Sequence, residues 1–566
     1  MSRLDSHLRI FYRGLKVAFV FSFFINLLML VVPVYSLQLF TRVLTSQSLE
    51  TLIMLSGITV FLLIVQSLID LSRNHLVSAT GINFSQGLAP QLLSHSIKEQ
   101  AHNSQAKSQE AIKQLSDVRN TLTSSAVYGL FDLPWAPIFL LAMFLIHPWL
   151  GWIAIGGAAT LLVIGILTSW YATKQELITQ TTESQNHALA QKYTEYSTSV
   201  MALGLLNSVI NRWKTNNQTL LVLNAKSSKP ITNLSIITKL FRMLLQVSVM
   251  GLAVYLALIQ EVSAGAVIAA SIIMSRSLAP FEQAVTYWKH WKKGLHSFKQ
   301  LKRVIQSNDD KEATITLPEP KGKLSTSALF FTFPNSNEPF LKNINLKFEP
   351  GTLYGLIGSS GSGKSTLGKI LLGCNYPSNG QVTLDGADVH QWLDQGLGKH
   401  LGYLSQDVQL LPGTVAENIG RFETDNSEDI IKTAQLVGIH DMILSLPLGY
   451  ETPIGFGGME LSGGQQQRIG LARALYKSPK VIVLDEPNAN MDPESELKLI
   501  KALQTMREHG SCIILITHKP SIIAQTNQLV VLNAGEVVKQ GPTAEIMNSA
   551  KQELTQKKSG VANEQA

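Results

Sequence analysis

The sequence predicts an α-helical domain with six membrane spans, followed by an α/β domain of the P-loop type. Three observations lead to this fold class. Long apolar runs fill roughly the first 300 of the 566 residues. The remainder alternates short β-rich runs with helical patterns, as α/β domains do. A glycine-rich phosphate-binding pattern follows one of the predicted strands.

Composition agrees with this division. The chain is 45% hydrophobic and 15% charged, and the charged share lies below the quarter that is usual for soluble domains. Both cysteines, Cys374 and Cys512, fall in the second half. Two buried thiols in a reducing compartment explain them better than a disulfide framework or a metal cluster. No small-residue cleavage site follows the first apolar run, so we expect it to remain as a membrane anchor.

Six apolar runs approach the roughly 20 residues that a membrane span needs. We expect the six helices at about 17–41, 51–70, 126–146, 150–172, 242–260 and 262–283. The predicted layout is a membrane domain over 1–305, a linker over 306–320, an α/β domain over 321–550 and a polar tail over 551–566.

The connecting loops differ sharply in length and charge. The loops after spans one, three and five are short, and Arg42 is their one Lys or Arg. The loop after span two is long and holds Arg73, Lys98, Lys107, Lys113 and Arg119. The loop after span four is long and basic as well. Positive residues mark cytoplasmic loops, so we expect the long loops and both termini in the cytoplasm, with helices continuing below the membrane.

Two ionisable residues fall at membrane depth. Asp132 lies in the stretch FDLPWAP, and Arg276 lies in the sixth span. Such groups usually face a cavity or a partner. Alternatively, both sit at the membrane interface, with Asp132 helping to cap a helix and Arg276 snorkelling towards water. The sequence leaves these two interpretations open.

Two further features belong to the last span. Its stretch SAGAVIAAS is rich in small residues, which predicts close packing with neighbouring helices. The basic, aromatic segment 288–303 follows it. We interpret this segment as a membrane-surface region beside anionic lipid rather than as a nucleic-acid site.

The α/β half carries a phosphate-binding loop. TLYGLI, a predicted strand, leads into GSSGSGKST, which fits G-x-x-x-x-G-K-[ST] between strand and helix. Backbone N–H groups of such a loop wrap phosphate oxygens, and the helix N-terminus adds positive potential. We expect Lys364 to reach the β- and γ-phosphates of ATP and Ser365 to bind Mg²⁺. The residues of this predicted ATP site are Gly358, Ser359, Ser360, Gly361, Ser362, Gly363, Lys364, Ser365 and Thr366.

An acid pair follows a second predicted strand, VIVLDE over 481–486. Asp485 is placed to hold Mg²⁺, directly or through water. Glu486 is placed to orient or deprotonate the attacking water. Without the upstream phosphate loop, an acid pair that caps a neighbouring helix would be the better interpretation.

The stretch LSGGQQQR, over 461–468, opens another helix and so forms a second anion site. LSGGQ resembles the signature of ATP-binding cassette (ABC) proteins. The resemblance implies that two cassettes pair head to tail, each signature closing on the γ-phosphate held by the other. The residues implied to act in trans are Ser462, Gly463, Gly464, Gln465 and, at the dimer interface, Asp492.

Three further positions resemble the family's motifs. Gln406 in YLSQD looks like the lid glutamine that senses Mg²⁺ and the membrane helices. His518 in LITHK looks like the switch histidine that contacts the γ-phosphate. Phe333 stands where the family usually stacks a tyrosine on adenine, and phenylalanine keeps the stacking face. Alternatively, Phe333 is strand core.

One cassette per chain implies a partner, because two composite ATP sites need two cassettes. A C₂ homodimer is the simplest solution. A heterodimer with a related chain is the alternative, although this chain retains Lys364, Ser462, Glu486 and His518 and therefore has the parts for two working sites.

The membrane half resembles type I secretion ATPases, the exporters of proteases, haemophores and lipases. FDLPWAPIFLLAMFLIHPWLG, PVYSLQLFTRVLTSQSLETL and SAGAVIAASIIMSRSLAPFEQ resemble their membrane segments, and LDEPNANMD, with Asn488 and Asn490, resembles their cassette. About 16 residues precede the first span, so we expect no N-terminal peptidase-like domain. A lipid or drug exporter and a membrane-anchored regulatory ATPase remain alternatives.

This resemblance implies export of an unfolded protein with an uncleaved C-terminal signal across the bacterial inner membrane. The implied partners are a second copy of the chain, a periplasmic adaptor, an outer-membrane tunnel, the secreted polypeptide and membrane lipids, with no nucleic acid. Our hypothesis for the route is that Asp132 and Arg276 border it.

Overall fold

A computed structural model describes most of the chain. The described residues are 3–102, 109–124, 126–309, 317–334, 336, 338–393, 396–423, 427–455, 457–489 and 491–549. The chain divides into two compact units, Met1–Lys98 with Lys107–Asp310, and Glu99–Ala106 with Lys311–Ala566. We call them the membrane domain and the cassette domain. Asn490, the polar tail and residues 310–316 of the predicted linker lie outside the described residues.

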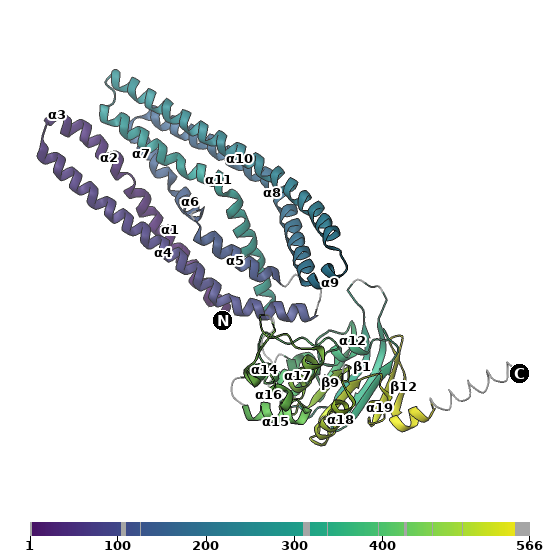
Figure 1. The fold of residues 1–566 in the computed structure, drawn as a ribbon. Coiled ribbons are helices and arrows are strands. Elements are labelled where there is room, and N and C mark those ends of the chain that lie inside the picture. Colours follow the sequence, from purple (N-terminus) through teal and green to yellow (C-terminus); the bar gives the residue numbers. More distant parts are fainter. Residues whose placement is uncertain are drawn as a thin grey trace. The chain divides into compact units, whose positions relative to one another are not determined.

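The described part of the membrane domain consists of helices joined by short connections (Figure 1). Its elements are α1 (Arg3–Leu28), α2 (Val31–Gln38), the π-helical η1 (Leu39–Val43), α3 (Leu44–Ser46), α4 (Leu49–His102), α5 (Gln109–Thr123), α6 (Ala126–Asp132), the 3₁₀ segment η2 (Leu133–Trp135), α7 (Ala136–Ile146), α8 (Pro148–Glu195), α9 (Ser197–Ala202), α10 (Leu206–Leu258) and α11 (Ala264–Asp309).

Six stretches of the described chain are long and apolar enough to cross a membrane, which confirms the six-span fold class. They are Leu8–Ser46, Leu49–Gln100, Ala126–Ile146, Pro148–Leu167, Leu206–Leu258 and Ala264–Trp288. Several helices continue far beyond one membrane thickness. α4 has 54 residues and α10 has 53, each about 80 Å long at 1.5 Å per residue. The long loops that separate the predicted spans are therefore largely helical.

The first span begins earlier and ends later than the sequence suggests. We expected 17–41, whereas the apolar helical stretch runs over Leu8–Ser46. The basic residues before position 17 hide its start, because they interrupt the apolar run without interrupting the helix. The stretch is also broken: α1 ends at Leu28 and α2 restarts at Val31, just before Pro33, a residue that has no N–H to donate.

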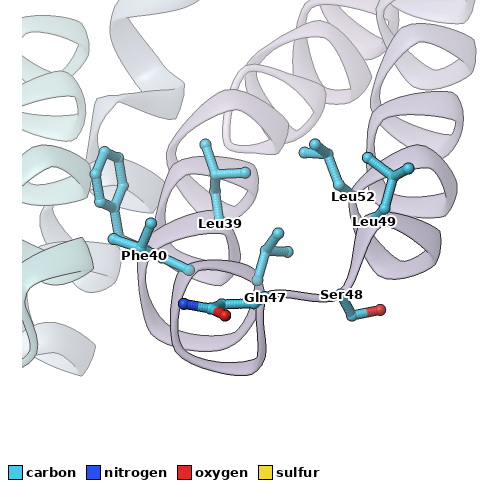
Figure 2. Close-up of a pocket in the computed structure, with 8 residues that line it drawn as sticks. Leu39, Phe40, Gln47, Ser48, Leu49 and Leu52 are labelled. Carbon is cyan, nitrogen blue, oxygen red and sulfur yellow. The ribbon is translucent and has the colours of Figure 1, made fainter.

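A tight turn joins the first two spans. Gln47 adopts a left-handed conformation there, with φ of 50°. Figure 2 shows Leu39 and Phe40 on one side of this turn and Leu49 and Leu52 on the other. These side chains line a mainly apolar hollow of about 500 Å³.

The helices α8, α10 and α11 run side by side (Figure 1) and share an apolar core with α7. Small residues at the start of α11 permit close packing, as the sequence predicted. A Cβ atom on Gly265 would lie 2.7 Å from the carbonyl oxygen of Leu37 in α2, so a larger residue does not fit there. Ala266, Ala269 and Ala270 are buried next to it.

The basic segment after the sixth span packs its aromatic side chains into the membrane domain, so our interpretation of a membrane-surface region is wrong for these side chains. Trp291 is 5% exposed, and its indole N–H donates to the carbonyl oxygen of Ala126 at 2.6 Å. Phe298 stacks on Phe11 with ring centroids 5.6 Å apart. The aromatic positions therefore form a helix face that packs inside the membrane domain, a pattern that basic neighbours on the other face had obscured.

In the part of the cassette domain that the structure describes, helices surround three sheets. Its strands are β1 (Leu324–Phe331), β2 (Leu341–Phe348), β3 (Leu353–Gly358), β4 (Asn379–Leu384), β5 (Ala387–Asp388), β6 (Leu401–Leu404), β7 (Gly413–Thr414), β8 (Pro453–Ile454), β9 (Val481–Asp485), β10 (Cys512–Ile516), β11 (Gln528–Asn533) and β12 (Glu536–Pro542). Its helices are α12 (Lys364–Leu371), α13 (Val389–Leu393), η3 (Leu397–His400), α14 (Val415–Ile419), α15 (Ser427–Val437), α16 (His440–Leu444), η4 (Gly449–Glu451), α17 (Gly463–Leu475), α18 (Pro493–Glu508) and α19 (Pro520–Ile523).

The largest sheet has the strand order β12-β11-β3-β10-β9-β6, and all its strand pairs except β11–β12 are parallel. The smaller sheets have the orders β2-β1-β4-β5 and β7-β8. Strands β9 and β10 are buried at every position, which explains their uninterrupted apolar sequences. Their carboxyl ends point to one edge of the sheet.

Candidate functional site

The carboxyl ends of four neighbouring parallel strands form the framework of the candidate ATP site. In the register of the sheet, Ile516 of β10 pairs with Asp485 of β9 and with Leu356 of β3. Leu404 of β6 pairs with Leu484, one residue before Asp485. The segments that follow these strands therefore lie along one edge. Ligand sites of parallel α/β sheets form at this edge.

The phosphate loop connects β3 to α12 and depends on two glycines. Gly363 caps α12 with φ of 103°, a left-handed conformation that favours glycine. A Cβ atom there would lie 2.5 Å from the side chain of Leu341. A Cβ atom on Gly358 would collide with the carbonyl oxygen of Leu532. The predicted residues Ser359 to Ser362 form the loop between these glycines, and Thr366 lies in the first turn of α12.

Lys364 lies across this loop. Its Nζ donates to the carbonyl oxygens of Gly358 and Ser359, both at 2.9 Å. Burial lowers the pKa of Lys364, while the carboxylates of Glu486 and Asp485 raise it. The ammonium group is thus held beside the loop by weak neutral acceptors, which phosphate oxygens can replace with stronger, charge-assisted bonds.

Two of the three predicted Mg²⁺ ligands, Ser365 and Asp485, are in contact. Ser365 forms a side-chain hydrogen bond with Asp485. Burial raises the pKa of Asp485, and the hydrogen bond from Ser365 lowers it. A hydroxyl beside a single carboxylate is a donor set that suits Mg²⁺, which takes its remaining ligands from phosphates and water. These residues therefore fit the metal.

Glu486 and His518 face each other beside this pair. Glu486 Oε1 lies 3.6 Å from His518 Nε2, and the two side chains are 31% and 51% exposed. Glu486 has φ of 50°, uncommon for a residue other than glycine, and its N–H donates to the carbonyl oxygen of Ile516 at 2.9 Å. The backbone thus aims a partly exposed carboxylate at the space above the phosphate loop.

A residue that the sequence analysis missed holds Glu486 in place. The side-chain amide of Gln467, in α17, donates to the carbonyl oxygen of Glu486 at 2.8 Å. Gln467 is buried on the face of α17 that also buries Gly470, Leu471 and Ala474. Its position on the core-facing side of the helix could have predicted a supporting role, because buried amide side chains need hydrogen-bond partners. The signature helix and the acid pair are therefore linked within one chain.

The signature begins α17 with a capping box. The hydroxyl of Ser462 accepts from the N–H of Gln465 at 3.3 Å, and the side chain of Gln465 accepts from the N–H of Ser462 at 2.9 Å. The serine hydroxyl proton stays free to bind an anion, and the first-turn amides of Gly463 and Gly464 have no helical acceptors. Asp492 caps α18: its carboxylate accepts from the N–H of Ser495 at 2.8 Å. Hydrogen bonds from the side chain and the backbone of Ser495 lower the pKa of Asp492.

Phe333 follows β1 and is 44% exposed, so it is not strand core. Its ring contacts those of Phe331 and Phe340, with centroids 5.1 Å and 5.0 Å away. Phe340 in turn lies beside the phosphate loop, since its ring would be 3.4 Å from a Cβ atom on Gly363. The exposed ring of Phe333 is thus connected to the phosphate loop through the packed rings of neighbouring phenylalanines.

The predicted lid residue Gln406 lies just beyond β6, and its side chain is exposed.

In the membrane domain, Asp132 has a buried partner. Arg73 is 4% exposed, and its guanidinium lies 2.9 Å from Asp132 Oδ1 and 2.7 Å from Asp70 Oδ1. Asn26 also donates to Asp132 at 3.0 Å. The side chain of Asp132 caps no helix. The sequence analysis did not predict Arg73 as the partner of Asp132, because it treated Arg73 as one of several basic residues in a cytoplasmic loop. Asp70, three residues before Arg73 and at the end of an apolar run, could have indicated a buried charged cluster there.

Arg276 occupies a separate place. It is exposed on α11 and lines a polar hollow together with Arg242 of α10. No contact joins Arg276 to Asp132 among the described residues, so the structure does not bring the two predicted path residues together.

The fold and the site define an ABC transporter. A family model described as ABC transporter matches residues 341–489. A solved structure of a bacterial Atm1-family ABC exporter with ATP bound is similar with a TM-score of 0.79 over 95% of this chain and 96% of that one. The two are 20% identical, so this similarity supports the fold alone.

Two curated relatives narrow the class. The type I secretion system ATP-binding protein PrsD of Rhizobium meliloti (strain 1021) is 34% identical over 530 residues, covering 93% of this chain and 91% of PrsD. The leukotoxin translocation ATP-binding protein LktB of Mannheimia glucosida is 28% identical over 541 residues, covering 94% of this chain and 76% of LktB. The chain belongs to the type I secretion family of ABC transporters.

Proposed function

We propose that this chain uses ATP hydrolysis to export an unfolded protein with a C-terminal secretion signal across the inner membrane. It acts as the ABC component of a type I secretion system. The observation that carries the proposal is the 34% identity with a type I secretion ATP-binding protein across both domains of the chain. An assembled ATP site at the edge of the main sheet supports it.

ATP hydrolysis is assigned to the residues at that edge. When ATP binds, the Lys364 ammonium group donates to phosphate oxygens in place of the carbonyl oxygens of the phosphate loop. The backbone N–H groups of the loop bind the same phosphates. Ser365 and Asp485 would hold Mg²⁺, which neutralises charge on the phosphates when bound. Glu486 takes a proton from the attacking water or orients it, and His518, 3.6 Å away, contacts the γ-phosphate. Gln406, just beyond β6, would sense the same Mg²⁺.

The ATP site is completed by a second copy of the chain. In a C₂ homodimer, the helix start at Ser462, Gly463 and Gly464 closes on the γ-phosphate bound by the partner, and Gln465 and Asp492 lie at that interface. This arrangement explains why the Ser462 hydroxyl keeps its proton free in the single chain. ATP binding closes the dimer and reshapes the membrane helices, and hydrolysis resets them.

The exported chain passes between the membrane domains, with the cassette domains and both termini in the cytoplasm. A periplasmic adaptor and an outer-membrane tunnel continue the route. We place Asp132 and Arg276 along it. The lysines and arginines of the long loops support this orientation.

Mass spectrometry of the culture medium tests the proposal. Cells carry the native chain, Glu486→Gln or the matched control Glu494→Gln, whose side chain is exposed on α18 and pairs with Lys498. We expect one or a few proteins with intact C-termini to disappear from the medium with Glu486→Gln alone. Unchanged secretion accompanied by altered envelope lipids or drug tolerance would instead favour a lipid or drug exporter.

A further inference from the structure

A polar hollow of about 370 Å³ lies between α10 and α11. Its polar lining residues are Arg242, Gln246, Ser271, Ser275 and Arg276. Arg242 and Gln246 are one helical turn apart on α10, as are Ser271 and Ser275 on α11, so each helix presents a polar face to the hollow. Polar faces are rare on membrane-spanning helices and mark functional pathways.

One positive charge in this hollow is unbalanced. Arg242 Nε lies 2.9 Å from Glu282 Oε2, so its charge is paired. Gln246 donates to the hydroxyl of Ser271 at 3.5 Å. Arg276 is exposed, and within the described ranges no hydrogen bond or ion pair joins it to another residue. The hollow thus offers a guanidinium with neighbouring hydroxyl and amide donors.

If the sixth candidate span, Ala264–Trp288, enters the hydrocarbon core at its first residue, the hollow lies within the core rather than at a headgroup layer. At 1.5 Å per residue, Arg276 is about 18 Å from the start of α11 at Ala264. A hydrocarbon core is about 30 Å thick, so Arg276 falls about 12 Å short of its far side, and helix tilt increases that margin. Anionic lipid head groups bind basic pockets at the membrane surface. Depth and a mainly polar lining therefore favour a ligand that crosses the membrane.

We propose that this hollow binds carboxylate groups of the exported polypeptide, with the Arg276 guanidinium as the main contact. A guanidinium matches a carboxylate with two parallel hydrogen bonds, and Gln246 and Ser275 supply further donors. Acidic segments of a cargo are then held at this point of the route. The inference rests on the proposed function, because it requires a polypeptide in the membrane domain.

Peptide binding to the full-length protein in phosphatidylcholine nanodiscs tests the inference. The probes are a fluorescent unstructured peptide with several glutamates and its twin with glutamines at those positions. We expect the native protein to bind the glutamate peptide about tenfold more tightly than the twin, as two charge-assisted hydrogen bonds allow. Arg276→Gln should abolish this preference. Arg276→Lys should retain part of it, and Arg212→Gln, which removes an exposed arginine of α10 outside the hollow, should retain all of it.

Two results would overturn the inference. One is an equal preference in the native protein and Arg276→Gln, when both show the same thermal unfolding. The other is a preference that anionic phosphatidylglycerol displaces, with less of this lipid bound to Arg276→Gln, because the occupant would then be a lipid phosphate. Either result leaves the proposed function standing as long as cargo secretion still depends on Glu486.

Discussion

The guanidinium of Arg73 lies 2.9 Å from the carboxylate of Asp132 and joins α4 to the end of α6, where the helix changes to a 3₁₀ turn. The side chains are 5% and 15% exposed. Because Arg73 also contacts Asp70 and the hydroxyl of Ser22, one cation holds the first three spans together at the FDLPWAP stretch.

Removing this cation should cost more stability than neutralising its partner. Arg73→Met leaves Asp132 buried without a counter-charge, which costs roughly 3–5 kcal/mol for buried pairs. Asp132→Asn leaves Arg73 paired with Asp70 and should cost clearly less. Thermal unfolding of the purified protein measures both. The double variant should lose less than the sum of the single variants, whereas strict additivity would show that the pair is not coupled.

Asp132→Asn also tests the route. If Asp132 borders the path of the cargo, this variant should slow export while ATP hydrolysis by the purified protein stays largely intact. Secretion at the native rate would remove Asp132 from the path and leave it a purely structural role in the Arg73 cluster.

Phe333 should set nucleotide affinity through its exposed ring. Phe333→Ala removes the stacking surface, and base–aromatic stacking contributes about 1–3 kcal/mol, so the Kd for ATP should rise roughly 5- to 150-fold. Phe333→Tyr keeps the ring and should bind ATP as the native protein does. Titration with a fluorescent ATP analogue measures both. Equal affinity of all three proteins would mean that adenine binds elsewhere.

Mixed dimers test whether the signature acts in trans. Lys364→Ala inactivates the phosphate loop, and Ser462→Arg inactivates the signature, so each homodimer lacks a working site. If sites form between chains, a mixed dimer contains one intact site, and random pairing should restore about a quarter of the native ATPase activity. If each site forms within one chain, co-expression should restore nothing.

The two cysteines should resist alkylation in the folded cassette domain. Burial raises the pKa of Cys512 to about 12 and also raises that of Cys374. Both pKa values then exceed the ordinary value of about 8.5, so little thiolate forms at mildly alkaline pH, and labelling should accelerate as the pH rises further. Cys512 is fully buried and should react only on unfolding, after the partly exposed Cys374. Rapid labelling of Cys512 in the native protein, with Cys374→Ser as background, would contradict the buried geometry.

Much of the ATP site could be predicted because its parts are contiguous motifs that end strands or begin helices. The phosphate loop, the acid pair and the signature each carry a local backbone requirement that the sequence displays, such as Gly363 at a left-handed position. The parallel sheet then brings these segments to one edge through the pairing of β3, β10, β9 and β6. The six spans were equally visible, because their apolar length is a local property.

What escaped prediction depends on contacts between distant residues. Arg73 and Asp132 are far apart in sequence, and nothing local distinguishes Arg73 from the other basic residues of its loop. Gln467 supports Glu486, which follows β9, from the separate helix α17. The aromatic residues around Trp291 pack on helices far earlier in the chain, so their basic neighbours suggested a membrane surface instead. In each case the tertiary partner, rather than the local pattern, decides the role.

Pulse-chase labelling of a protein that disappears from the medium with Glu486→Gln is the most direct test of ATP-driven export. With the native chain, the full-length cargo should pass from cells to medium without a shortened form. With Glu486→Gln, it should stay in the cells, because removal of the carboxylate slows hydrolysis by about 100-fold or more. Release of the cargo at the same rate in both strains would contradict the account that hydrolysis by this chain drives protein export.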